Sequence, residues 1–220
     1  MYWRSLTKKV APSIEHMTLL RDLDINLIID IGANKGQFLM ACRHVHPSVR
    51  FIAFEPLKDE YDLLCQIARE GDYTFNFALG DSEGVQEFNI TSQRDSSSLL
   101  DDKFQSIIHK NVRFKDKCPI HVKRLDDIKL EGLADKTLMK LDVQGYELKV
   151  LKGGIQLIKN VQFIYLEVST IEFYEGQPLA QDIISFLNSH GFALWKIMNP
   201  TDRRKEVLQC DMLFQNMTQS

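Results

Sequence analysis

The sequence predicts an α/β fold in which a doubly wound, mostly parallel sheet is covered by helices on both faces. Short apolar runs alternate with segments of helical spacing along most of the chain. Such apolar strands are typical of a parallel sheet buried between helices. With 220 residues, 44% of them hydrophobic, the chain is long enough to bury this sheet in one domain over 1–220.

The N-terminal half is predicted to supply the first three strands. Residues 1–24 carry charges and lack the apolar core of a signal peptide, so we expect a helical segment that packs on the domain. Strands and helices then alternate, at 27–31, 37–46, 50–56, 58–70 and 73–79.

A polar stretch over 82–130 interrupts this alternation. It holds two strand-like pieces, 85–90 and 120–125, which predict a hairpin insertion. Long connections in compact domains are often functional. Two interpretations are open: a substrate lid that becomes ordered over Ser92–Lys117 when ligands bind, or a solvated hairpin on the surface.

The C-terminal half is predicted to add two parallel strands, 137–143 and 163–169, and then a helix that ends at Gly191. Two last strands are expected at 192–198 and 211–216. The polar stretch between them is short for a parallel crossover, so the two strands are predicted to pair antiparallel.

Composition and charge narrow the class of protein. The formal net charge of −3 argues against a general nucleic-acid binder. The four cysteines lie far apart, which favours reduced, buried thiols over a disulfide framework or a zinc site. No apolar run approaches the roughly 18–20 residues needed to span a membrane. We expect a cytoplasmic protein that needs no metal.

The stretch Asp-Ile-Gly-Ala-Asn-Lys-Gly follows the first strand directly. Gly32 and Gly36 let the backbone turn sharply and approach a ligand, and Asn34 tolerates left-handed geometry. Ligands of open parallel sheets bind at the carboxyl ends of the strands, where this loop lies. The next strand ends at Glu55, and an acid there can accept hydrogen bonds from both hydroxyls of a ribose.

Two kinds of cofactor use such a loop. A dinucleotide site favours the pattern Gly-x-Gly-x-x-Gly, which is absent here, and a carboxylate at Asp30 would oppose a pyrophosphate. S-adenosylmethionine carries an ammonium group, a sulfonium group and a ribose diol, which suit Asp30 and Glu55. We therefore expect an S-adenosylmethionine site formed by Asp30, Gly32, Asn34, Gly36 and Glu55.

Several motifs resemble the FkbM family of S-adenosylmethionine-dependent methyltransferases, in family order from about Leu27 to Phe214. They are the stretches 54–56, 77–84, 122–128, 139–154 and 165–169. The most specific is Lys-Leu-Asp-Val-Gln-Gly-Tyr-Glu-Leu-Lys-Val-Leu-Lys-Gly-Gly, in which Gln144 stands where the family commonly has Glu. The resemblance implies a seven-stranded, Rossmann-like sheet and an enzyme that methylates hydroxyl groups of sugars, glycans or related small molecules.

The resemblance also implies where the rest of the donor would lie. Ala78 and Leu79 follow the third strand and would contact the adenine. Asp81 would either reach the exocyclic amine or stabilise a turn. Asp142, at the end of the fourth strand, is expected to complete the donor site.

Three acids are candidate catalytic residues. Asp142 can hold the donor's amino group, bind the acceptor hydroxyl or act as the base, and the alternative is a helix N-cap. Glu147 lies in the first turn of the next helix, where it either serves catalysis or complements the helix dipole. Glu167 lies within an apolar strand, where a charge is costly unless it is paired or faces a cleft. We favour Asp142 for the donor and Glu167 for the acceptor.

If neither acid removes the acceptor's proton, His109 and His121 of the polar insertion are the next candidate bases. Around them lies a basic cluster that either attracts a phosphorylated acceptor or forms a solvated face. Its members are Lys110, Arg113, Lys115, Lys117, Lys123 and Arg124.

Two other functions stay open. A methyltransferase acting on RNA or DNA would usually show a broader basic surface and an Asn-Pro-Pro-Tyr-type motif, which is absent here. A non-catalytic S-adenosylmethionine-binding module would be expected to lose the donor-site acids, yet Asp30, Glu55 and Asp142 are present. The expected partner is a small-molecule or glycan acceptor, not a nucleic acid.

Overall fold

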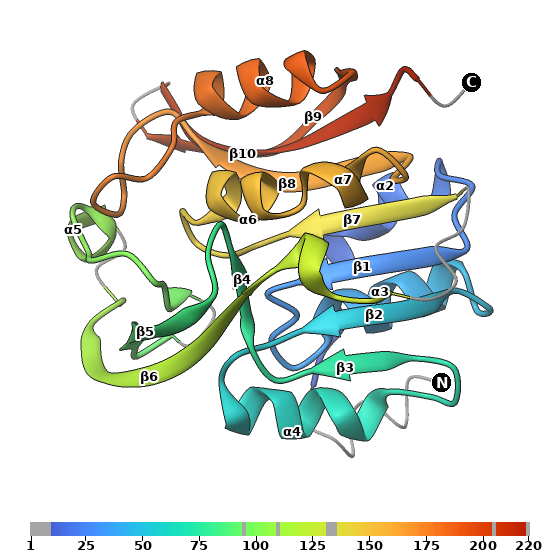
Figure 1. The fold of residues 1–220 in the computed structure, drawn as a ribbon. Helices are drawn as coiled ribbons and strands as arrows, with labels where there is room; N and C mark the ends of the chain where they lie inside the picture. Colours follow the sequence, from blue (N-terminus) through green and yellow to red (C-terminus); the bar gives the residue numbers. More distant parts are fainter. Residues whose placement is uncertain (1–9, 94–95, 109–110, 131–135, 204–205, 219–220) are drawn as a thin grey trace.

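A seven-stranded sheet forms the centre of the molecule, in a computed structural model that describes residues 10–93, 96–108, 111–130, 136–203 and 206–218 (Figure 1). Its strand order is β3-β2-β1-β7-β8-β10-β9, so the chain starts in the middle, moves to one edge and then builds the other half. Five strands run parallel: β1 (Leu27–Ile31), β2 (Arg50–Phe54), β3 (Tyr73–Phe75), β7 (Thr137–Leu141) and β8 (Phe163–Ser169). The predicted doubly wound α/β fold is confirmed.

The last two strands pair antiparallel, as the sequence predicts. β9 (Phe192–Arg203) and β10 (Glu206–Asn216) form a hairpin, and β10 lies between β8 and β9 with its direction opposite to both. The expectation of a polar connection over 199–210 is wrong, because the two strands continue through nearly all of it. There Gln209 pairs with Thr201 on one side and with Ser169 on the other, which brings the polar part of the hairpin beside the carboxyl end of β8.

Helices cover both faces of the sheet, and each face has its own buried core (Figure 1). Successive residues of a strand point to opposite faces, so Ile28 packs in one core and Ile29 in the other. On the face of Ile28 lie η1 (Ile14–His16), α2 (Met17–Arg21), α3 (Gln37–Val45) and α4 (Lys58–Ile67). On the face of Ile29 lie α6 (Glu147–Gly153), α7 (Ile155–Ile158) and α8 (Ala180–Ser189).

The predicted N-terminal helical segment over 1–24 contains η1 and α2, and its residues 1–9 lie outside the described residues. Both short helices pack beside α3. Across the described ranges, each helix is too short or too polar to cross a membrane.

A second, three-stranded sheet lies at the carboxyl end of the main sheet (Figure 1). β5 (Gly84–Thr91) and β6 (Phe114–Arg124) pair antiparallel, which confirms the predicted hairpin insertion. β4 (Ala78–Gly80) pairs parallel with β6. In the chain, the short helix α5 (Gln105–Ile108) comes between β5 and β6, and η3 (Leu125–Asp127) follows β6 before β7.

The expectation of one strand over 73–79 is wrong, because the chain changes sheets within it. β3 ends at Phe75, and β4 begins in the second sheet at Ala78. Asn76 Nδ2 donates hydrogen bonds of 2.9 Å to the carbonyl oxygens of Glu55 and Pro56, which holds the turn against the end of β2. The turn therefore leads the chain from the main sheet past the residues that follow β2.

α6 packs so closely on β4 that Gly153 has no room for a side chain, since a Cβ there would lie 1.9 Å from the carbonyl oxygen of Gly80. We expect Gly153→Ala to lower the free energy of unfolding by about 2 kcal/mol, because the clash outweighs the better helix propensity of alanine. Chemical denaturation measures this loss. The control is Gly84→Ala, where nothing lies within 4 Å of the added Cβ. It should change the free energy by less than about 0.5 kcal/mol; equal stability of the two variants would contradict the packing.

Candidate active site

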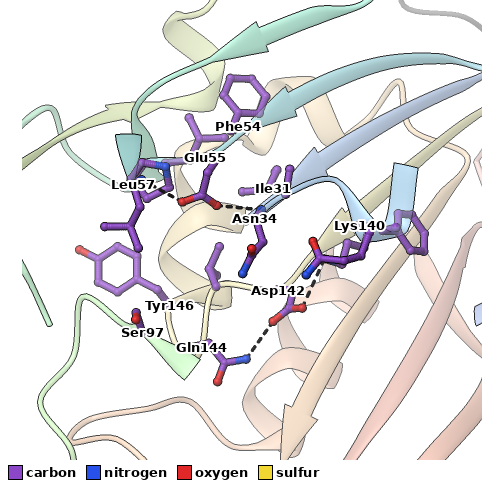
Figure 2. A pocket seen from close by; sticks show the side chains of 18 of the residues that line it. Ile31, Asn34, Phe54, Glu55, Leu57, Ser97, Lys140, Asp142, Gln144 and Tyr146 are labelled. Carbon is purple, nitrogen blue, oxygen red and sulfur yellow. Dashed lines mark hydrogen bonds and ion pairs between the residues drawn. The ribbon is translucent and has the colours of Figure 1, made fainter. Parts of the chain in front are cut away.

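Two cavities meet at the carboxyl end of the main sheet. The first cavity has a volume of about 220 Å³ and is lined by residues that follow β1 and β2, by β4 and by the end of β7 (Figure 2). The second cavity, of about 530 Å³, is lined by the ends of β7 and β8, by the β9–β10 hairpin and by part of the insertion. The two cavities share a wall made by Glu15, His16, Lys140, Asp142 and Gln144.

Glu55 follows β2 directly and lines the first cavity (Figure 2). Its Oε2 accepts a hydrogen bond from the N–H of Asn34, and its Oε1 accepts one from the N–H of Leu57, both at 2.8 Å. Burial raises the pKa of Glu55 to about 7, although the two hydrogen bonds act in the opposite direction. The carboxyl group is therefore held in one orientation, and each of its oxygens can accept a second hydrogen bond.

The loop after β1 approaches the end of β7 very closely. Gly32 has a φ of 79°, and a Cβ there would lie 2.0 Å from the carbonyl oxygen of Asp142, so only glycine fits. Asn34, with a φ of 49°, lines the first cavity. Gly36 lines neither cavity; a Cβ there would lie 2.3 Å from Ile67 Cδ1, so Gly36 permits the close packing of α3 on α4.

Lys140 carries a buried positive charge between two acids. Its Nζ lies 3.4 Å from Asp30 Oδ1. On the other side it lies 3.3 Å from Asp142 Oδ2, a contact that Figure 2 shows. Asp30 and Lys140 are partners in register on β1 and β7. Asp30 is 0% exposed and lines neither cavity, so it lies behind the shared wall and contacts Lys140 instead of a ligand.

These contacts set the charges at the shared wall. Burial acts to raise the pKa of Asp142, but Lys140 and a 2.9 Å hydrogen bond from Gln144 Nε2 outweigh it, and the pKa lies below its ordinary value. Burial also acts to lower the pKa of Lys140, but Asp30 and Asp142 raise it above its ordinary value. Lys140 and Asp142 are therefore both charged at neutral pH.

Glu147 lies beneath the loop that follows β7. Its Oε1 accepts hydrogen bonds of 3.2 Å from the N–H groups of Val143 and Gly145, and the side chain lines neither cavity. Burial raises the pKa of Glu147 to about 7. Glu147 thus fixes the loop that directly follows Asp142.

The remaining predicted residues lie in different places. Ala78 and Leu79 line the first cavity. Asp81 is exposed and lines neither cavity, and the same holds for His121 on β6. His109 and Lys110 lie outside the described residues. Among the residues that the structure describes, no group of three or more acidic, histidine or cysteine side chains is arranged to hold a metal ion.

Glu167 lines the second cavity from β8, beside Asp142 from the end of β7. Gln209 Nε2 on β10 donates to Glu167 Oε2 at 3.2 Å. Burial raises the pKa of Glu167 well above its ordinary value, and the nearby Asp142 and Asp211 add to this effect. Of the three candidate catalytic acids, Asp142 and Glu167 therefore face one cavity, but Glu167 holds a proton more readily than Asp142 does.

The second cavity is lined mainly by polar side chains. Besides its acids, it presents the amide and hydroxyl groups of Gln93, Ser96, Gln105, Asn199, Thr201 and Gln209. These groups both donate and accept hydrogen bonds. Because an apolar ligand would leave them unpaired at a cost, the second cavity suits a ligand rich in hydroxyl or amide groups.

Four further residues of the two cavities are not among the site residues predicted from the sequence. Lys140 could have been predicted, since a lysine within an apolar strand needs a partner such as Asp30. The others are His16, Tyr165 and Asp211, which lie far apart in the sequence and are joined by hydrogen bonds. No local sequence pattern links them.

The chain is similar to known methyltransferases. A family model described as the methyltransferase FkbM domain matches residues 30–194. The chain is 29% identical over 179 residues to the 2-O-methyltransferase NoeI of Sinorhizobium fredii, a match that covers 74% of this chain and 71% of that protein. It is 26% identical over 196 residues to the methyltransferase sdnD of Sordaria araneosa, covering 75% of this chain and 73% of that protein.

A solved structure shares the fold. The magnesium protoporphyrin IX methyltransferase of Synechocystis, with bound S-adenosylmethionine, is 11% identical and has a TM-score of 0.51. The match covers 92% of this chain and 76% of that chain. The likeness shows the same arrangement of sheet and helices.

The contact between Lys140 and Asp30 generates a prediction about stability. We expect Lys140→Met to lower the free energy of unfolding by about 3 kcal/mol, because Asp30 then stays buried without a partner. The loss should grow as the pH rises, since an unpaired buried Asp30 must hold a proton in the folded state but releases it when unfolded. Denaturation at several pH values measures both effects.

The double variant Asp30→Asn with Lys140→Met should lose less than the two single variants together. The control is Lys136→Met, which removes an exposed ion pair with Asp24 and should cost less than about 1 kcal/mol. A loss of the same size at Lys136 and at Lys140 would contradict this account of the buried contact.

Proposed function

Because the chain belongs to the FkbM methyltransferase family, we propose that it transfers a methyl group to a hydroxyl group of a sugar, a glycan or a related small molecule. Family and fold make it an S-adenosylmethionine-dependent methyltransferase. The observation that carries the proposal is the second cavity, which shares a wall with the first and is lined by groups that bind hydroxyls.

We assign the first cavity to S-adenosylmethionine, because its lining fits the parts of that molecule. Glu55 is held where it can accept hydrogen bonds from a ribose diol, and the apolar Leu57 and Leu79 suit the adenine. Asp142 keeps its negative charge at the shared wall and suits the ammonium group. When bound, S-adenosylmethionine supplies a methyl group on a positively charged sulfur.

The other residues of the predicted donor site support this cavity in different ways. Gly32 and Asn34 form its loop. Asp30 holds Lys140 from behind the wall, and Gly36 lets α3 pack closely on α4. Asp30 and Gly36 therefore act on the donor through the shape and charge of the wall.

We assign the second cavity to the acceptor. Glu167 and Gln209 are hydrogen-bonded to each other there and are placed to bind acceptor hydroxyls. A relative that is 29% identical is a 2-O-methyltransferase, which supports oxygen as the accepting atom. Insertion residues such as Gln93 and Gln105 line the same cavity, which supports a role of 82–130 in covering the acceptor.

The main task of the chain is to hold the acceptor hydroxyl at the shared wall and to exclude water. Alignment of two reactants contributes roughly 7–11 kcal/mol to catalysis. Asp142 is fixed for this task by Lys140 and Gln144, and Glu147 fixes the loop behind it. The shared wall is therefore rigid where the two ligands meet.

The assignment of Glu55 predicts a loss of donor binding. We expect Glu55→Ala to weaken S-adenosylmethionine binding by at least ~1.5 kcal/mol, because hydrogen bonds to a charged group are lost. In the unchanged chain the affinity should rise as the pH increases through about 7, where Glu55 ionises. The pH dependence should be absent in Glu55→Ala. Calorimetry with the donor and with its demethylated product measures both.

The matched control is Glu83→Ala, since Glu83 is exposed and lines neither cavity. Thermal unfolding of each variant separates lost binding from lost folding. Unchanged affinity in a folded Glu55→Ala chain would overturn the assignment of this residue.

The acceptor class is tested by transfer of a tritium-labelled methyl group to monosaccharides, glycolipids and RNA. We expect label in a sugar, and we expect it to resist mild alkali because a methyl ether is not hydrolysed as a methyl ester is. Omission of the chain gives the background. Label in RNA alone, or no transfer by a chain that binds the donor, would contradict the proposal.

A further inference from the structure

A hydrogen-bonded chain of three side chains lies beside the shared wall. His16 Nδ1 lies 2.8 Å from Tyr165 Oη, and Tyr165 Oη donates to Asp211 Oδ2 at 2.5 Å. Asn199 Nδ2 donates to the same oxygen of Asp211 at 2.7 Å. His16 lines both cavities, and Tyr165 and Asp211 line the second. The elements η1, β8 and β10 thus converge on one imidazole.

The direction of these hydrogen bonds determines the tautomer of His16. The hydroxyl of Tyr165 has one proton, which it donates to Asp211, so its oxygen can only accept from His16. His16 therefore carries its proton on Nδ1, and Nε2 keeps a lone pair. Nε2 lies 3.6 Å from Oε1 of Glu15, which also lines both cavities. Nε2 is the ring nitrogen that remains for a ligand.

Charged groups on several elements face this imidazole. Burial and the charge of Lys140 lower the pKa of His16 below its ordinary value. Asp211, Glu15 and Asp142 act to raise that pKa without reversing the shift. The ring is therefore neutral at neutral pH, and the three acids are placed to stabilise the imidazolium that forms when it takes up a proton.

Two other carboxylates of the second cavity, Asp142 and Glu167, are placed differently. Asp142 lies at the shared wall, but it is bound by Lys140 and Gln144, which makes it a weak base. Glu167 lines only the second cavity and is not part of the wall where the donor and acceptor cavities meet. His16 combines a place at the wall with a lone pair on Nε2.

We propose that His16 is the catalytic residue that removes the proton of the acceptor hydroxyl, with Tyr165 and Asp211 as positioning residues that hold its tautomer. This proposal rests on the proposed function. His16 and Asp211 lie outside residues 30–194, the part of the chain that the family model matches, so the assignment comes from the geometry of this chain.

The proton and electron balance is simple. The O–H bond of the acceptor breaks, and its proton passes to Nε2 of His16. The electron pair on that oxygen forms the bond to the methyl carbon, while the bond from this carbon to sulfur breaks and leaves its electron pair on sulfur. The imidazolium is then neutralised by loss of its Nε2 proton to water.

The tautomer is tested by nitrogen NMR of the chain with labelled histidine, without any ligand. We expect the Nδ1–H form for His16, with the signal assigned by its absence in His16→Gln. In Tyr165→Phe the acceptor oxygen is gone, and the population should shift toward Nε2–H. An Nε2–H form of His16 in the unchanged chain would overturn the proposal.

The role in the reaction is tested at saturating donor, with the acceptor that takes most label in the transfer screen. His16→Gln should lower turnover by about 10²–10⁴-fold, because glutamine cannot take up the proton. Its donor affinity should change by less than about threefold, since only the proton transfer is removed. Tyr165→Phe should lower turnover roughly tenfold or more, because the imidazole of His16 is then present in the wrong tautomer.

The pH profile supplies a readout that a structural role would not move. Turnover of the unchanged chain should fall as the pH drops through the pKa of His16, and this acidic limb should be absent in His16→Gln. The matched control is His190→Gln, at the end of α8 and away from both cavities. A folded His16→Gln chain that keeps more than a tenth of the turnover would overturn the proposal.

Failure of this proposal is distinguishable from failure of the proposed function. If label enters a sugar but His16→Gln transfers it normally, the function stands and the base lies elsewhere. If no hydroxyl acceptor is labelled, the proposed function fails, while the NMR result still decides whether Tyr165 and Asp211 hold the tautomer of His16.

Discussion

The ammonium group of Lys140 lies where β1 and β7 end, with Asp30 buried on one side and Asp142 at the cavity wall on the other. This one charge lets an aspartate stay in the core of the sheet, because a buried carboxylate needs a partner. It also holds the pKa of Asp142 below its ordinary value and adds to the effect of burial in lowering the pKa of His16. Lys140, Asp142 and His16 all line the wall that the two cavities share, so the charge pattern of that wall depends on a contact between two neighbouring strands.

The bounds of strands that are buried on both faces could be predicted better from the sequence than those of strands with another environment. β1 and β8 have the predicted bounds, because each is an apolar run interrupted by a single acid. The run over 73–79 looked continuous too, but the side chain of Asn76 holds a turn inside it. β9 and β10 extend into a polar stretch because a hairpin needs only backbone pairing there, and that pairing leaves no apolar pattern to read.

The site divides in the same way. Glu55, Asp142 and the glycine loop follow buried strands, so the topology of a parallel sheet places them together at its carboxyl end. Lys140 could have been predicted in the same way, because it is a charged residue within an apolar strand. His16 and Asp211 could not be predicted, because they are 195 positions apart in the sequence and the packing of η1 beside β8 brings them together.

The two cavities differ in where their walls come from. The first is built by loops that tight contacts hold in place, as where the backbone of Gly32 meets that of Asp142. Much of the second comes from peripheral segments: the short helix η1, the insertion and the β9–β10 hairpin. Side chains of these segments such as Gln93, Gln105 and Thr201 line the second cavity and belong to neither apolar core. With the second cavity assigned to the acceptor, such side chains are natural targets for redesigning acceptor preference, because their replacement leaves the first cavity and the proposed base in place.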